Sequence, residues 1–150
     1  MNDPLIVIVD SDGIVAQSNL TDANHDLAVK ISEKLVEIGA KVIYPSCIVF
    51  ESTTTMARKF NDPQMAVGTL SVFANPSMII EPVDQAIVVG AAKYYDSNAT
   101  KKNTTFDAAV AAVADKYKAD YIFGFDGFYE KKGFKLAKNL LSTNPSGRSG

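Results

Sequence analysis

The chain has 150 residues, 47% of them hydrophobic and 21% charged, which suits one folded soluble domain with a buried core and excludes a disordered protein. Its formal net charge of −2 excludes a globally basic protein that binds nucleic acid or membranes through overall charge. An anionic partner would therefore have to meet a local cluster of cations or a bound metal ion.

The single cysteine and the single histidine exclude two further kinds of protein, those held by an internal disulfide and those that bind zinc through cysteine and histidine. The single cysteine, Cys47, cannot form a disulfide within the chain, and its apolar neighbours favour a small buried side chain. The single histidine, His25, has no second histidine or cysteine with which to form a zinc site. No signal peptide and no apolar stretch of about 18 residues is visible, so we expect a cytoplasmic protein that does not contact a membrane.

The predicted elements alternate between strands and helices. Residues 5–10 (LIVIVD) are a continuous apolar run, typical of a strand buried on both faces. Residues 22–39 carry apolar side chains at helical spacing and end at Gly39. Further strands are predicted at 41–44, 77–82 and 120–125, with a last possible one at 133–137. Further helices are predicted at 47–60, 63–74, 83–95 and 106–119.

This alternation predicts a single-domain, three-layer α/β/α fold with a central parallel sheet. The segment 47–60 is rich in β-branched residues, but Pro45 before it and the alternation favour a helix. We place the domain at residues 1–140. Residues 141–150 are interpreted as a flexible tail or a vector-derived remnant.

Two acids follow predicted strands. Asp10 ends the first strand, and Asp126 follows the strand at 120–125. In an open parallel sheet, ligands bind beyond the carboxyl ends of the strands, so these two side chains can lie side by side. Glu51 and Asp107 interrupt apolar helical contexts. Each acid alone has an ordinary explanation, such as a helix cap for Asp107 or an Asp-Gly turn for Asp126.

The stretch "DSDG" (10–13) allows a different interpretation, a haloacid-dehalogenase-like phosphatase. Asp10 would then be the nucleophile and Asp12 the acid/base. Asp126 and Glu130 imitate the late acidic pair of such enzymes only weakly, and no convincing lysine motif is found. This alternative also leaves Glu51 and Asp107 without a role.

As a set, the acids resemble the pattern of the PIN domain, a nuclease fold found in VapC-type toxins and ribosomal-RNA processing factors. The matching stretches are "DSD", "VFESTTTMAR", "TTFDAAVAAVADKYKAD" and "YIFGFDGFYEKKGFKLA", which together cover nearly the whole chain in order. Two features depart from the pattern. Gly124 stands where a hydroxyl residue is usual, two before the last aspartate, and the polar loop 96–104 is long.

The resemblance implies a metal-dependent endoribonuclease that hydrolyses RNA phosphodiester bonds. Clustered carboxylates repel each other, and an all-oxygen site suits Mg²⁺ or Mn²⁺, whether one ion or two. The expected catalytic and metal-binding residues are Asp10, Glu51, Asp107 and Asp126. Asp10 and Asp126 are expected to be direct ligands, Asp107 a ligand or a partner through water, and Glu51 the group that orients the attacking water or holds a second ion.

Other residues are expected to assist. Asp12 and Thr104 are expected to hold these ligands in place. The RNA backbone is expected to meet nearby cations, namely Lys101, Lys102, Lys131, Lys132 and Lys135.

Chain length points, within this resemblance, to a stand-alone toxin of a toxin–antitoxin pair. Such proteins pair as homodimers and are silenced by an antitoxin peptide that fills the acidic groove. A PIN scaffold that binds RNA or protein with little turnover is the remaining alternative. The RNA target and the identity of an antitoxin are not visible in the sequence.

Overall fold

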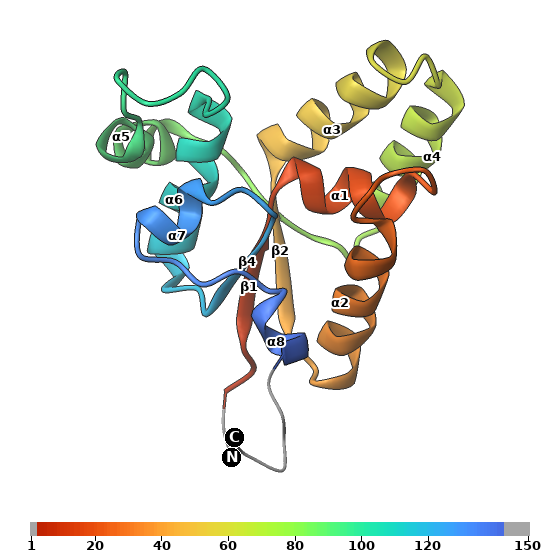
Figure 1. Cartoon of the computed structure of the whole chain (residues 1–150), viewed down its shortest axis with the longest axis horizontal. Helices are drawn as coiled ribbons and strands as arrows, with labels where there is room; N and C mark the ends of the chain where they lie inside the picture. The colour runs from red at the N-terminus through yellow and green to blue at the C-terminus, as the bar shows by residue number, and fades with distance from the viewer. Residues whose placement is uncertain (1–2, 143–150) are drawn as a thin grey trace.

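A four-stranded parallel sheet lies at the centre of the computed structural model, which describes residues 3–142 (Figure 1). The strand order is β3-β2-β1-β4, and every neighbouring pair is parallel. The strands are β1 (Ile6–Val9), β2 (Lys41–Pro45), β3 (Ile79–Glu81) and β4 (Tyr121–Phe123).

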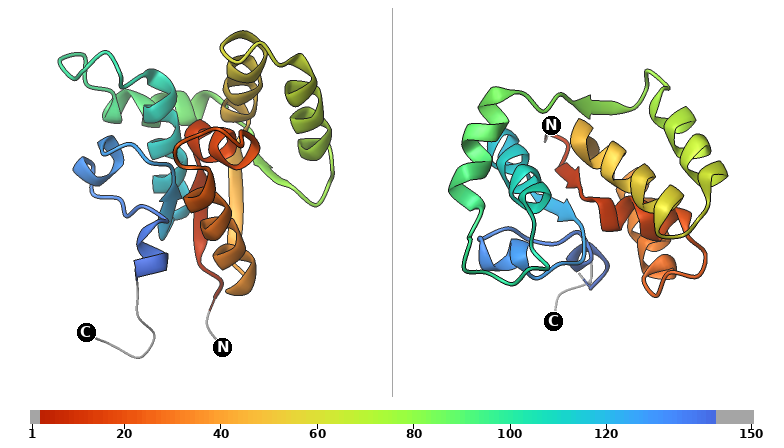
Figure 2. Two further views of the ribbon diagram at one scale, coloured as in Figure 1. Left: turned by 45° about the vertical axis from the view of Figure 1, so that its right-hand side comes forward. Right: turned by 90° about the horizontal axis from the view of Figure 1, so that it is seen from above.

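Helices cover both faces of this sheet. Figures 1 and 2 show α5, α6 and α7 on one side and α1 and α2 on the other, with α3 and α4 extending beyond the carboxyl ends of the strands. The helices are α1 (Ser11–Ser18), α2 (His25–Glu37), α3 (Ser46–Arg58), α4 (Pro63–Phe73), α5 (Gln85–Tyr94), α6 (Thr105–Tyr117), α7 (Phe128–Lys131) and α8 (Asn139–Ser142).

The core forms where β1 meets α6. Val7, Ile8 and Val9 are fully buried because helices cover both faces of the strand. Every residue of α6 from Ala108 to Ala114 is buried, since its small side chains let this helix pack between the sheet and α5. The apolar sequence of α6 therefore reflects burial on all sides.

Most of the elements predicted from the sequence are present, including the helix at α3. The last possible strand, at 133–137, is reduced to one parallel bridge between Ile122 and Leu136. Helix α1 was not predicted, because its short sequence around Gly13 resembles a turn. Of the tail predicted at 141–150, residues 141 and 142 end α8, and the others lie outside the described residues.

Among residues 3–142, no helix has the length and apolar character needed to cross a membrane.

Gly13 is required by close packing of α1 on β4. A Cβ atom at this position would lie 2.5 Å from the backbone oxygen of Phe123. Gly68, in the middle of α4, has open space at the same position. Gly13 and Gly68 thus differ in whether a methyl group can be accommodated.

We predict that Gly13→Ala lowers the free energy of unfolding by about 1–3 kcal/mol, because the methyl group overpacks against backbone. Gly68→Ala should instead raise it by up to about 1 kcal/mol, since alanine favours the helix. Urea denaturation of both variants measures the difference. Equal effects of the two substitutions would contradict the packing of α1 on β4.

Candidate active site

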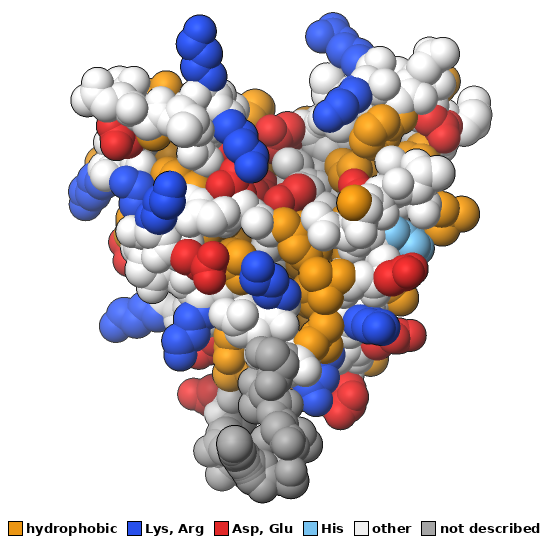
Figure 3. All heavy atoms as spheres, in the orientation of Figure 1, with side chains coloured by type: hydrophobic (Ala, Val, Ile, Leu, Met, Phe, Trp, Pro, Cys, Tyr) orange, Lys and Arg blue, Asp and Glu red, His pale blue; other side chains and the backbone are white. Residues whose placement is uncertain are grey.

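Five carboxylates from five segments meet at the carboxyl end of the sheet, and we call them the acid cluster. Figure 3 shows acidic side chains gathered in a hollow on this face, between the α5–α6 side and the α3–α4 side of the molecule. Their electrostatic interactions and shared hydrogen-bond donors connect them to one another. The members are Asp10 after β1, Asp12 in α1, Glu51 in α3, Asp107 in α6 and Asp126 after β4.

Asp10 links the sheet to helix α1. It follows the last residue of β1, and its backbone N–H donates to the carbonyl of Phe123 at 3.0 Å, which continues the pairing with β4. Its Oδ1 accepts the backbone N–H of Ser11 at 2.6 Å, so it is the N-cap of α1. The side chain is therefore held at the end of β1 by the start of the next element.

Two neutral donors bridge members of the acid cluster. The hydroxyl of Tyr129, a fully buried residue, donates to Asp10 Oδ2 at 2.5 Å and lies 3.5 Å from Asp107 Oδ1. The amide Nδ2 of Asn103 lies 3.2 Å from Asp126 Oδ2 and 3.4 Å from Asp107 Oδ2. Three acids are thus connected in the order Asp10, Asp107, Asp126 by donors that carry no charge.

Neither bridging residue was identified from the sequence. Tyr129 follows Phe128 and resembles a core aromatic pair, and Asn103 lies in a polar loop beside the predicted Thr104. Thr104 itself contributes through its backbone, because its N–H donates to Asp107 Oδ2 at 2.9 Å at the start of α6. Asp107 is therefore a helix-capping residue as well as a member of the acid cluster.

Asp12 and Glu51 each hold a buried oxygen without a partner. Asp12 Oδ2 accepts the backbone N–H of Phe125 at 2.8 Å, but Asp12 Oδ1 and Glu51 Oε1 have no hydrogen-bond partner among the described residues. A buried carboxylate oxygen left unpaired is costly unless it is protonated or meets a cation. These two atoms mark where the acid cluster lacks a positive partner.

Burial raises the pKa of four of these carboxyl groups. The pKa of Asp10 lies well above its usual value, first because of burial and then because of the charge of Asp12, although the Tyr129 hydroxyl opposes this. Burial raises the pKa of Asp12 to about 6, against the lowering effect of the Phe125 N–H. Burial likewise raises the pKa of Glu51 and the pKa of Asp107. The negative charge of Asp107 raises the pKa of Glu51 further, and that of Asp126 raises the pKa of Asp107 further.

The acid cluster suits a hard divalent cation by its donor chemistry. All its side-chain ligands are carboxylate oxygens, which Mg²⁺ and Mn²⁺ prefer, and two of those oxygens are buried and unpaired. Within residues 3–142, however, no three Asp, Glu, His or Cys side chains are already arranged as a metal-binding group. The residues thus fit an ion by chemistry and charge, and a coordination shell would have to form by side-chain adjustment.

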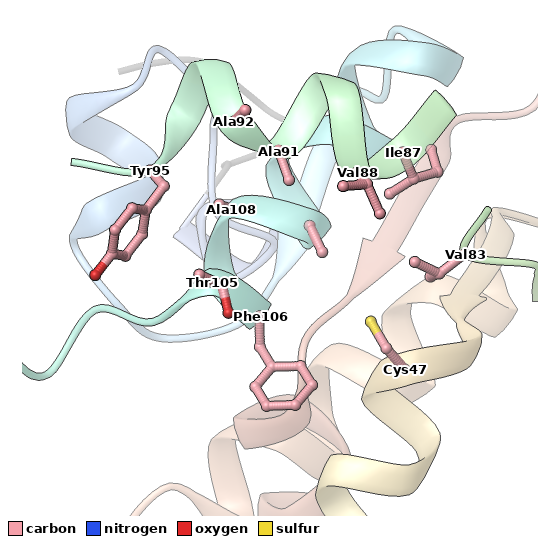
Figure 4. Close-up of a pocket in the computed structure, with 11 residues that line it drawn as sticks. Cys47, Val83, Ile87, Val88, Ala91, Ala92, Tyr95, Thr105, Phe106 and Ala108 are labelled. Atoms are coloured by element: carbon pink, nitrogen blue, oxygen red, sulfur yellow. The ribbon is translucent and has the colours of Figure 1, made fainter. Parts of the chain in front are cut away.

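An apolar cavity lies beside the acid cluster, between α3, α5 and α6 (Figure 4). Its volume is about 440 Å³, and Cys47 and Phe106 line both it and an adjoining hollow that includes Glu51. Cys47 is half-buried at this boundary, less enclosed than expected from its neighbours, and burial raises its pKa to about 11. A thiol held in its neutral form is a poor nucleophile.

The lysines predicted to contact RNA lie near the acid cluster in sequence and carry exposed or partly exposed side chains. Lys101 and Lys102 are exposed in the loop before α6. Lys131 ends α7, and Lys132 after it places its Nζ 5.6 Å from the centre of the Phe128 ring. Lys135 is exposed. The cations therefore flank the segments that supply Asp107 and Asp126.

Comparison with known proteins gives likenesses in structure only. No protein-family model matches the chain, and no curated protein matches it in sequence. VapC20 of Mycobacterium tuberculosis, described as a sarcin-ricin loop cleaving toxin, is 21% identical with a TM-score of 0.71, over 85% of this chain and 95% of that one.

Two further solved structures agree with this likeness. VapBC2 of Rickettsia felis, bound to a DNA fragment from its promoter, is 13% identical with a TM-score of 0.63, over 88% of this chain and 97% of that one. FitAcB of Neisseria gonorrhoeae is 14% identical with a TM-score of 0.62, over 87% and 95%. The PIN-like three-layer α/β/α fold predicted from the sequence is thereby confirmed.

We predict that Asp12→Asn stabilises the metal-free protein increasingly as pH rises. The folded-state pKa of Asp12, about 6, exceeds its unfolded value, so the wild type loses stability as pH rises from about 4 through 6, whereas asparagine does not titrate. At about 1.4 kcal/mol per pKa unit, the difference in unfolding free energy between variant and wild type should grow by about 3 kcal/mol from pH 4 to 7. Urea denaturation in EDTA measures it. A difference that does not change with pH would show that Asp12 is not buried among the acids.

Proposed function

We propose that this chain, which has the PIN-like fold, is a divalent-metal-dependent endoribonuclease. The observation that supports it best is the acid cluster, with unpaired buried oxygens on Asp12 and Glu51. Clustering buried carboxylates is unfavourable for stability, so its presence at the carboxyl end of a parallel sheet indicates a functional site. A cation bound there also gives a protein of net charge −2 the means to bind an anionic phosphodiester.

Asp10, Glu51, Asp107 and Asp126 would hold Mg²⁺ or Mn²⁺. When bound, the ion would neutralise the cluster and stabilise the charge that develops on the phosphate. Asp10 accepts hydrogen bonds from Ser11 and Tyr129, and Asp107 and Asp126 share Asn103, so only small side-chain adjustments would separate these three from a coordination shell. Glu51 Oε1 is not engaged by another described group, which suits it to orient the attacking water and accept its proton.

The phosphatase alternative is less well supported. It uses Asp10 and Asp12 but gives no role to Glu51 and Asp107. Both of these carboxyl groups interact with Asp12, and Asp107 also lies near Tyr129 and Asp10. The ribonuclease proposal, in contrast, gives a role to all five members of the acid cluster.

We further propose that the chain is the toxin of a toxin–antitoxin pair and forms homodimers. The support is the fold it shares with VapC20, VapBC2 and FitAcB. The apolar cavity beside Glu51 offers a surface for an antitoxin segment. On α4, Val67, Leu70 and Val72 are exposed apolar residues available for a second copy.

We predict that millimolar Mg²⁺ or Mn²⁺ stabilises the wild type and supports RNA cleavage. An ion at 100 times its Kd should add about 2.7 kcal/mol to the free energy of unfolding. Asp126→Asn should abolish both the metal response and cleavage, because it replaces an anionic carboxylate ligand with a neutral amide. Thermal unfolding and cleavage of single-stranded RNA, with metal and with EDTA, are the measurements.

Asp62→Asn is the matched control for this experiment. Asp62 caps α4 through a 3.0 Å bond from the N–H of Met65, and asparagine can serve as the same cap. This variant should keep the metal response and the activity. Metal binding without cleavage would favour the scaffold alternative, and absence of any metal response in the wild type would contradict the ribonuclease proposal.

We predict that the paired substitution Lys101→Ala/Lys102→Ala weakens RNA binding without changing sequence preference. Phosphate contacts supply affinity by counterion release, so loss of each contact should reduce the slope of log K against log salt by about 0.7 for single strands. Fluorescence anisotropy with labelled RNA, in the non-cleaving Asp126→Asn background, gives the slope. Lys30→Ala, a substitution at an exposed position of α2, is the control variant. Equal slopes for the two variants would show that Lys101 and Lys102 do not contact RNA.

A further inference from the structure

The geometry points to Tyr129 as a positioning residue that orients Asp10 and Asp107 for metal binding. This inference rests on the proposed function, because it concerns the same acid cluster. Tyr129 lies 119 residues beyond Asp10 in the chain and still places its hydroxyl 2.5 Å from Asp10 Oδ2. The Tyr129 hydroxyl oxygen also lies 3.5 Å from Asp107 Oδ1, so one hydroxyl contacts the acid that follows β1 and an acid of α6.

The Tyr129 ring is fixed by its surroundings. It is fully buried, and it packs edge-to-face on Phe128 with 5.3 Å between ring centres. Its backbone oxygen accepts the N–H groups of Lys132 and Phe134 at 3.1 and 3.0 Å, which closes the turn after α7. These contacts hold the ring with its hydroxyl beside Asp10.

Gly124 leaves the space beside Asp10 without a side chain of its own. A Cβ atom at this position would lie 3.0 Å from both Asp10 Cβ and Asp12 Oδ1, and 3.4 Å from Tyr129 Cε2. Residue 124 therefore has no side-chain donor to offer, and a larger residue there would crowd both acids. Among the described side chains, it is Tyr129 that donates to Asp10.

A neutral donor suits this position better than a lysine or arginine. A cationic side chain would pair with the acids and compete with a metal ion for them. A hydroxyl fixes the direction of Asp10 Oδ2 and leaves the negative charge of the acid cluster available. Removal of a side chain that hydrogen-bonds to a metal ligand commonly weakens metal affinity 10–100-fold.

The test is isothermal titration of the full chain with Mn²⁺, comparing wild type, Tyr129→Phe and Tyr117→Phe. Tyr117 is a matched control, because its hydroxyl also donates to a buried carboxylate, Glu81 Oε1, at 2.5 Å outside the acid cluster. We expect Tyr129→Phe to raise the Mn²⁺ Kd about tenfold or more and Tyr117→Phe to leave it unchanged.

A second measurement applies if Tyr129→Phe does not fold. In the wild type, Mg²⁺ should shift the tyrosine ring NMR signals of Tyr129 with the Kd of metal binding, and those of Tyr117 should not move. An unchanged Mn²⁺ Kd in folded Tyr129→Phe, or Tyr129 signals that stay fixed at Mg²⁺ saturation, would overturn the positioning role. A wild type that binds no Mn²⁺ would instead overturn the proposed function, so the two failures are distinguishable.

Discussion

Mutual repulsion among five clustered carboxylates, of which Asp10 is buried and the other four are partly buried, is the constraint around which this structure is arranged. The parallel sheet brings the ends of β1 and β4 together, and the first turns of α1 and α6 add two more acids at the same edge. Burial removes the water that would otherwise screen these charges, and this raises the pKa of Asp10, Asp12, Glu51 and Asp107. The hydrophobic packing of the sheet and α6 must offset that cost.

Much of the local structure around the acid cluster limits this repulsion without removing its charge. Backbone N–H groups of Ser11, Thr104 and Phe125 each donate to one acid, and the side chains of Tyr129 and Asn103 each contact a pair of acids. All these donors are neutral. The negative potential of the site is therefore retained for a cation while the directions of the carboxylates are held.

The sequence was sufficient to predict the fold and to place Asp10 and Asp126 at one edge of the sheet, because both follow from strong local signals. Glu51 and Asp107 were joined to them only by the resemblance to the PIN pattern. A continuous apolar run identifies β1, and an acid directly after a strand in a parallel sheet must lie at its carboxyl edge. Helix α1 was missed because its evidence is a single N-cap contact from Asp10 and a packing contact at Gly13, neither of which has a periodic signature. Tyr129 and Asn103 were missed because a tyrosine beside another aromatic residue and an asparagine in a loop have common structural roles. Only three-dimensional distances show that each contacts two acids.

Gly13 has a consequence for how short motifs are interpreted. In a phosphatase, the tetrapeptide Asp-x-Asp-Gly would reflect a nucleophile and its acid/base partner. Here the glycine is present because α1 passes so near the carbonyl of Phe123 that a β-carbon has no room. One four-residue string can thus arise from helix–strand packing as readily as from phosphoryl chemistry.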